Sequence, residues 1–240
     1  MHLIPCSSPS DVAVRCADLV AEVLERHAAP VFLAPAGRTP VGLYEELARR
    51  TRSGLLDLER AHFVQLDELV GVPSTDPRSF QRFLIEHLQG PAGLSREHMH
   101  LLDGGAADPA EELVRHGKKL SQLGVPALAL LGIGLNGHVA FNEPGSTGES
   151  RAQVVSLADA TIDGLRKSFE EHELPSSGMT LGLVEILGSD ALALLATGRS
   201  KARVVAALLE GSNNSALPAS HLVGHPSLRL FADEEARGRI

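Results

Sequence analysis

A short loop near the middle of the chain gathers side chains that can move protons. The segment GLNGHVAFNEPGS places Asn136, His138, Asn142 and Glu143 within eight residues, directly after a strongly apolar run. An imidazole exchanges protons near neutral pH, and a nearby carboxylate can fix its tautomer and stabilise its protonated form. The spacing indicates acid–base chemistry, and the alternative is a structural histidine that is hydrogen-bonded within the loop.

The same loop is a poor candidate for a metal site. His138 and Glu143 are the only plausible ligands nearby and no cysteine joins them, whereas zinc sites take three or four protein ligands. We therefore expect no metal ion. None of the glycine-rich patterns of nucleotide-binding loops is present either, so no organic cofactor is expected.

Asp67 and Glu68 follow a second apolar run, at 62–66. A carboxylate at the end of a strand can act as a general base if burial raises its pKa. The alternative is a pair of acids on a surface turn, which position alone favours.

Two further segments have the form of anion-binding turns. PAGRTP at 35–40 and TGRSK at 197–201 each follow an apolar run and open a predicted helix. Small residues let backbone N–H groups approach a phosphate, and a helix N-terminus adds positive potential. Arg38, Thr39 and Lys201 can add donors and charge, although each segment taken alone also fits an ordinary turn with a solvated cation.

The hydrophobic pattern predicts the scaffold that holds these segments. Apolar runs predict strands near 31–34, 62–66, 99–104, 127–134, 154–158, 191–198 and 227–233. Helical spacing predicts helices near 12–24, 41–47, 79–88, 109–123, 160–171 and 201–209. Such alternation is typical of βαβ units, in which a mainly parallel sheet carries helices on both faces. We predict a single Rossmann-like, three-layered α/β domain over residues 1–240.

This scaffold would bring the polar segments together. In parallel sheets, ligands bind beyond the carboxyl ends of the strands. PAGRTP, QLDE, GLNGHVAFNEPGS and TGRSK all follow predicted strands, so we expect them to converge on one rim.

Composition narrows the class of protein. The formal net charge of the 240 residues is -8, and such a surface repels nucleic acid and anionic membranes. A phosphorylated ligand would therefore need local positive charge. No apolar stretch is long enough to span a bilayer, and the start MHLIPCSSPSD does not resemble a signal peptide. Cys6 and Cys16 are too few for a disulfide framework, so we expect a cytoplasmic protein.

Taken together, the motifs resemble those of the glucosamine-6-phosphate deaminases, also called isomerases. GIGLNGHVAFNEPGS is similar to the signature of that family, and MHLIP, PAGRTP, FVQLDELVGVP, ATGRSKARVVAALLEG and LPASHLVGH extend the resemblance nearly end to end. The related 6-phosphogluconolactonases share the fold and a Gly-His motif but lack the Phe-Asn-Glu-Pro run, which lies here at 141–144. That run favours the deaminases.

The resemblance implies a role for each matching position. Asp67 would carry a proton between C2 and C1 of the sugar, and His138 would open the pyranose ring by moving a proton at the ring oxygen. Glu143 would orient and stabilise His138, and Asn136, an Asp in some relatives, would only form hydrogen bonds. The phosphate would lie among Gly37, Arg38, Thr39, Lys201 and one of Arg166 and Lys167. The implied reaction converts glucosamine 6-phosphate to fructose 6-phosphate and ammonia without a cofactor.

Departures from the family pattern leave alternatives open. Arg38 stands where relatives usually have Gly, Leu69 where Tyr is usual, and Lys167 at an Arg position. Another amino-hexose phosphate such as galactosamine 6-phosphate, a 6-phosphogluconolactonase activity, and a non-catalytic sugar-phosphate sensor therefore remain alternatives. Cations that serve an allosteric activator in hexameric relatives are lacking after Glu143, so we expect a monomer or a small homo-oligomer.

Overall fold

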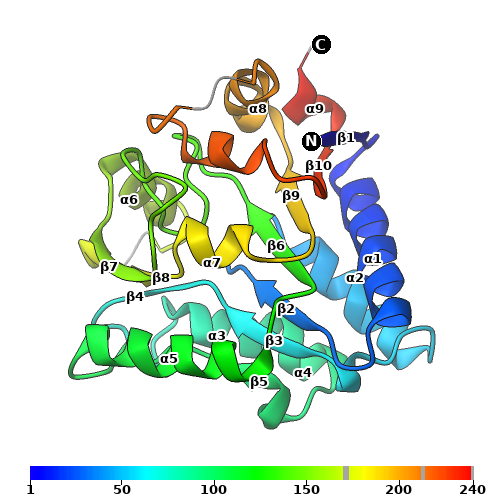
Figure 1. The fold of residues 1–240 in the computed structure, drawn as a ribbon, viewed down its shortest axis with the longest axis horizontal. Helices are drawn as coiled ribbons and strands as arrows, with labels where there is room; N and C mark the ends of the chain where they lie inside the picture. The colour runs from blue at the N-terminus through cyan, green and yellow to red at the C-terminus, as the bar shows by residue number, and fades with distance from the viewer. Residues whose placement is uncertain (170–172, 212–213, 239–240) are drawn as a thin grey trace.

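A parallel sheet of seven strands lies at the centre of the computed structural model, which describes residues 1–169, 173–211 and 214–238 (Figure 1). The strand order is β1-β10-β9-β6-β2-β3-β5, and all neighbours are parallel. The strands are β1 (His2–Pro5), β2 (Val31–Ala34), β3 (His62–Gln65), β5 (Met99–His100), β6 (Leu128–Gly132), β9 (Leu192–Ala196) and β10 (Leu228–Ala232). The predicted α/β class with a mainly parallel sheet is confirmed.

Helices cover both faces of this sheet (Figure 1). The longer ones are α1 (Pro9–Arg26), α2 (Val41–Arg52), α5 (Pro109–Leu123), α6 (Asp159–Arg166) and α8 (Ala202–Leu209). The shorter ones are α3 (Phe80–Leu84), α4 (Gly90–Ala92), α7 (Leu183–Leu187) and α9 (Glu234–Arg237). Single turns are η1 (Leu58–Arg60), η3 (Arg96–His98), η4 (Arg199–Lys201) and η5 (Pro218–Leu222), and the π-helical η2 (Ile85–Gln89) joins α3 to α4. None of the described helices is long and apolar enough to cross a membrane.

Strand β2 shows why both faces need helices. Phe32 and Ala34 belong to one apolar cluster, with residues of α1 and α2, whereas Val31 and Leu33 belong to another, with residues of α5, α7 and α8. Successive side chains of a strand point to opposite faces, so a strand covered on both sides is a continuous apolar run. All four residues of β2 are buried, as the run VFLA predicts.

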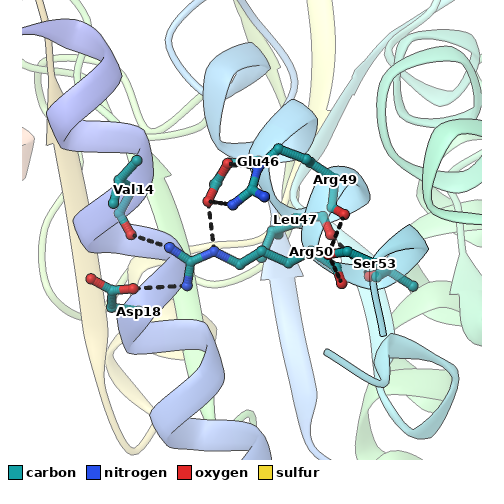
Figure 2. A network of polar contacts seen from close by, with 8 residues as sticks. Val14, Asp18, Glu46, Leu47, Arg49, Arg50 and Ser53 are labelled. Carbon is teal, nitrogen blue, oxygen red and sulfur yellow. Dashed lines mark hydrogen bonds and ion pairs between the residues drawn. The ribbon is translucent and has the colours of Figure 1, made fainter. Parts of the chain in front are cut away.

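The first two helices are joined by one arginine (Figure 2). Arg50 of α2 pairs with Asp18 of α1 at 2.7 Å and with Glu46 at 2.6 Å, and it also donates to the carbonyl of Val14. The side chains of Arg50 and Glu46 are each 13% exposed, so this ion pair is less screened by water than a pair on an open surface, whereas Asp18 is largely exposed. The contacts hold α1 and α2 to each other, and the apolar side chains of both helices pack on β2, whose carboxyl end leads into PAGRTP.

The strand predicted near 154–158 lies outside the parallel sheet, so that part of the prediction is wrong. β7 (Gln153–Ser156) pairs antiparallel with β8 (Ser177–Thr180), which pairs antiparallel with β4 (Asp67–Leu69). The residues of β7 are mostly exposed, which does not suit a central strand. This second, smaller sheet and α6 lie together on the left of Figure 1.

Other boundaries also differ from the sequence prediction. The strand predicted over 99–104 ends at His100, because the next backbone N–H groups bond to side chains: Leu102 donates to Gln65 and Asp103 donates to Glu112. The helix predicted over 160–171 is α6, which ends at Arg166. Residues 170–171 of that prediction lie outside the described residues.

Candidate active site

A pocket of about 450 Å³ lies at the carboxyl ends of β2, β3, β6 and β9. All four segments that were expected to converge contribute to it. Helix α6 contributes another part of the lining. The pocket-lining residues used below are Gly37, Arg38, Thr39, Asp67, Gly134, His138, Thr161, Lys167, Thr197, Ser200 and Lys201. The predicted convergence on one rim is therefore confirmed.

Asp67 is a buried carboxyl group that faces this pocket. It is 7% exposed, and burial, followed by the charge of Glu68, raises its pKa from 3.8 to about 8. Among the residues that the structure describes, no group donates a hydrogen bond to the Asp67 carboxylate. The alternative of a surface turn is thus wrong. A carboxylate with a raised pKa and no internal donor is suited to accept a proton from a bound ligand.

Glu68 has a different, structural position. It is completely buried, and its carboxylate accepts hydrogen bonds from both backbone and side-chain donors. The donors are the N–H groups of Leu69, Phe80 and Gln81 and the side chains of Ser79 and Gln65. Burial raises the pKa of Glu68 while these hydrogen bonds oppose the rise. Glu68 therefore ties the start of α3 to β4 and holds the strand that carries Asp67.

His138 lies beside Glu143, as predicted. The distance from His138 Nδ1 to Glu143 Oε2 is 3.6 Å. Asn136 Nδ2 donates to the same carboxylate oxygen at 2.9 Å, and Asn136 Oδ1 accepts from the His138 backbone N–H at 3.2 Å. Burial opposes the ionisation of Glu143, but polar interactions with His138 and then Thr161 outweigh it and lower its pKa to about 2. Glu143 is thus an anion that can stabilise a charged imidazole.

Thr161 is a member of this group that the sequence did not reveal. Its hydroxyl lies 2.9 Å from His138 Nδ1, nearer than the Glu143 carboxylate. Thr161 is 4% exposed and belongs to α6. The segment DATIDGLR has the pattern of an ordinary surface helix, so nothing local marks one of its residues as a partner of His138.

The backbone of the loop brings the imidazole into the pocket. The N–H of Gly134 donates to the carbonyl of His138 at 2.9 Å, which closes the loop on itself. Gly137 has a φ of +83°, a left-handed conformation that glycine adopts without the steric cost of a Cβ. The two glycines therefore shape the turn that presents His138.

Positive charge is concentrated in the pocket despite the acidic chain. Among its described lining residues, Arg38, Lys167 and Lys201 are basic. Lys201 Nζ donates to the carbonyl of Ile133 at 2.5 Å. Burial, followed by the charge of Arg38, lowers the pKa of Lys201 to about 8. A desolvated ammonium next to another cation is a site that an anion would stabilise.

The remaining donors come from two turns that open helices. Gly37 and Thr39 lie in the turn before α2, and Thr197 and Ser200 lie in the turn that leads through η4 into α8. Backbone N–H groups at a helix start, together with hydroxyl groups, can donate hydrogen bonds to phosphate oxygens. Thr197 and Ser200 lie within the predicted TGRSK turn, of which only Lys201 was among the expected site residues.

The structure separates the two cations that the sequence could not distinguish. Lys167 lines the pocket, whereas Arg166 pairs with Asp163 at 3.0 Å and both of those side chains are 66% exposed. Arg166 therefore does not belong to the pocket, and the ammonium of Lys167 lacks the planar fork with which arginine binds two oxygens at once.

Among the described residues, no three or more His, Cys, Asp or Glu side chains are grouped so that they could hold a metal ion. The arrangement that the pocket does offer is a proton-accepting carboxyl, an imidazole with an anionic neighbour, and a cluster of cations.

Comparison with known proteins shows which family has a similar sequence and fold. The model of the glucosamine-6-phosphate isomerases/6-phosphogluconolactonase family matches residues 7–230. Glucosamine-6-phosphate deaminase 1 of Giardia intestinalis is 36% identical over 238 residues, which cover 98% of this chain and 88% of that protein. A solved structure of a monomeric glucosamine-6-phosphate deaminase is 31% identical and superposes with a TM-score of 0.94 over 99% of both chains.

A 6-phosphogluconolactonase from Thermotoga maritima has the same fold. It is 20% identical, with a TM-score of 0.79, over 97% of this chain and 99% of its own. An identity this low supports the shared fold alone. The family model, the full-length relatives and the fold agree with the resemblance in the sequence motifs: the chain belongs to the glucosamine-6-phosphate isomerase/6-phosphogluconolactonase family.

Proposed function

We propose that this protein is an enzyme that converts glucosamine 6-phosphate and water to fructose 6-phosphate and ammonia. The observation that carries the proposal is Asp67, a buried carboxyl with a pKa of about 8 that shares one pocket with His138 and three basic side chains. Full-length relatives that are glucosamine-6-phosphate deaminases support it.

In the proposed reaction, the phosphate lies among Arg38, Lys167 and Lys201, and the sugar lies between His138 and Asp67. His138 takes the proton of the anomeric hydroxyl and delivers it to the ring oxygen, which opens the pyranose to the aldehyde. The Asp67 carboxylate then takes the proton from C2 and returns it to C1, while a proton of the C2 amine passes to the C1 oxygen. C1 thus becomes a hydroxymethyl group and the C2 amine becomes an imine. Water adds to that imine at C2, and ammonia leaves as fructose 6-phosphate forms.

The alternatives fit the pocket less well. A lactonase needs an activated water but no carboxylate that accepts a proton from carbon, so it would not use the raised pKa of Asp67. The hypothesis of a non-catalytic sensor was based on Arg38 and Leu69. Leu69 is completely buried in an apolar cluster with Phe80 and Phe141. Its replacement of a tyrosine therefore changes the packing behind β4 rather than removing a proton-handling group.

A substrate panel tests the proposal. We expect glucosamine 6-phosphate to yield ammonia and fructose 6-phosphate in equal amounts, and galactosamine 6-phosphate to react more slowly. Unphosphorylated glucosamine, as the matched control, should give turnover only at far higher concentration, because it cannot use the basic end of the pocket. Hydrolysis of 6-phosphogluconolactone alone would contradict the proposal, as would tight binding of the phosphosugars without any turnover.

The backbone of the catalytic loop offers a second test. A Cβ on Gly134 would lie 2.3 to 2.5 Å from three atoms of the His138 ring, so the ring must move. We expect Gly134→Ala to lower kcat by roughly 100-fold, because displacements of about 1 Å at a reacting group cost that much. Steady-state ammonia release measures it.

Gly117→Ala, which lies on α5 and outside the pocket, is the control for that test, because a Cβ there meets nothing within 4 Å. It should keep most of the activity. Similar losses in both variants, with unchanged thermal unfolding, would contradict the placement of His138 against Gly134.

We also propose that the enzyme acts in the cytoplasm as a monomer or a small homo-oligomer, without nucleic acid or membrane partners. The relative described as a monomeric deaminase supports the small assembly, and the formal net charge of -8 supports the absence of polyanionic partners. Light scattering of the purified chain would measure its mass, and a hexamer would contradict the proposal.

A further inference from the structure

The hydroxyl group of Thr161 interacts with both the His138 ring and the Glu143 carboxylate, which are too far apart to bond directly to each other. His138 Nδ1 and Glu143 Oε2 are 3.6 Å apart, which is beyond a good hydrogen bond. Thr161 Oγ1 lies 2.9 Å from the same ring nitrogen. Its side chain is buried, with 4% exposure, so bulk water does not compete for these contacts.

The donors and acceptors around Glu143 decide the direction of this bridge. An ionised carboxylate can only accept hydrogen bonds, and Glu143 already accepts from Asn136 Nδ2 at 2.9 Å and from the Ala158 N–H at 3.2 Å. A hydroxyl beside it is most stable when its hydrogen points to the carboxylate. The lone pairs of Thr161 then face His138, whose Nδ1 must be the donor.

We propose that Thr161 is a positioning residue that holds His138 in the tautomer with hydrogen on Nδ1. The hydroxyl accepts from Nδ1–H and donates to Glu143, which leaves Nε2 as the unprotonated nitrogen that is available to the pocket. The consequence for catalysis rests on the proposed deaminase function, in which the unprotonated Nε2 accepts the anomeric proton of the sugar and then delivers it to the ring oxygen. The tautomer itself depends only on the three side chains.

A pair of substitutions at this position separates the hydroxyl from the rest of the side chain. Thr161→Val keeps the shape but removes both hydrogen bonds, and Thr161→Ser keeps the hydroxyl. Acid–base groups contribute about 10²–10⁴-fold to a rate, so we expect kcat to fall at least ~10-fold in Thr161→Val with KM changed less than about twofold. Thr161→Ser should recover most of kcat.

The tautomer can be observed without any turnover. Histidine-labelled (¹⁵N) protein gives long-range proton–nitrogen spectra that distinguish the two neutral forms, and the His138 signals among the 11 histidines are those missing from a His138→Gln spectrum. At a pH at which the ring is neutral, we expect hydrogen on Nδ1 in the wild type and in Thr161→Ser. In Thr161→Val, we expect the population with hydrogen on Nε2 to rise.

Hydrogen on Nε2 in the wild type would overturn the inference, and so would a Thr161→Val protein with the tautomer and kcat of the wild type. Failure of the proposed function would look different, because the wild type would then not release ammonia although the nitrogen spectra still report the tautomer. Unfolding temperatures of the variants show whether any loss comes from the fold instead.

Discussion

Asp67→Asn is expected to abolish deamination while leaving the protein folded. An amide has nearly the shape of the carboxyl but cannot accept the C2 proton. General bases contribute about 10²–10⁴-fold to a reaction rate. In the proposed reaction, Asp67 is the group that takes the C2 proton, so kcat should fall by at least ~10³-fold. Affinity for the phosphosugar should persist, since the basic end of the pocket is untouched. Ammonia release and binding calorimetry measure the two effects separately.

The same substitution is expected to stabilise the fold at alkaline pH. The pKa of Asp67 is about 8 in the folded protein against 3.8 for an unperturbed aspartate. Below about pH 4 both states hold the proton, so the group does not affect stability. Between pH 4 and 8 the unfolded chain loses the proton first, and the free energy of unfolding falls as the pH rises.

Above about pH 8 the folded state carries the full cost of a buried carboxylate, roughly 6 kcal/mol at 1.36 kcal/mol for each pKa unit. Asn cannot ionise, so Asp67→Asn should gain several kcal/mol over the wild type at pH 9 and almost nothing at pH 4. Urea unfolding at both pH values measures this. The exposed Asp163→Asn is the control and should shift stability by less than about 0.5 kcal/mol. A gain independent of pH would contradict the raised pKa.

Asp67 and Glu68 also show what could be read from the sequence and what could not. The local pattern presents two adjacent acids after an apolar run and does not tell them apart; only the family resemblance pointed to Asp67. In the structure they lie on a strand, where neighbouring side chains point to opposite faces. One reaches the pocket and the other bonds to the N-terminus of α3. Which acid faces which side depends on α3 and β8, which pack there from elsewhere in the chain.

The central strands were predictable for a simple reason. VFLA and the apolar runs of β6 and β9 are buried on both faces, and such burial leaves a local signature. The sequence of β8 has no such apolar run, because it contains Ser177 and Gly178. A Cβ on Gly178 would lie 2.5 Å from the ring of Phe141, so glycine is required by a distant residue. The second sheet is therefore a product of tertiary packing, which local periodicity does not report.

The contact between Thr161 and His138 could not be predicted from the sequence for the same reason. It joins the loop after β6 to helix α6, and the two residues lie 23 positions apart. Lys167 and Arg166 differ in another way. Adjacent residues at a helix end project in directions about 100° apart, so one cation can line a pocket while the other points to solvent. The composition of a segment predicts that a cation is available, but only the orientation of α6 decides which one.

Lys201 is expected to control the alkaline side of the pH profile. The ratio kcat/KM reports ionisations of the free enzyme. Burial and Arg38 lower the pKa of Lys201 to about 8, and Asp67 has a pKa of about 8 as well. The active form needs Asp67 ionised and Lys201 charged. We therefore expect kcat/KM to follow a narrow bell-shaped pH profile with its maximum near pH 8. At lower pH, kcat/KM falls because Asp67 gains a proton, and at higher pH it falls because Lys201 loses one.

Two substitutions assign the alkaline limb. Lys201→Met removes a charged phosphate contact, and such contacts contribute about 1.5–3 kcal/mol, so kcat/KM at pH 8 should fall roughly 10- to 100-fold. Lys201→Arg keeps its charge throughout this range, so its profile should lose the alkaline limb and keep the acid limb. The phosphate and amine of the substrate titrate identically in every variant. An unchanged alkaline limb in Lys201→Arg would therefore assign that limb to the substrate and contradict a titrating lysine at the phosphate.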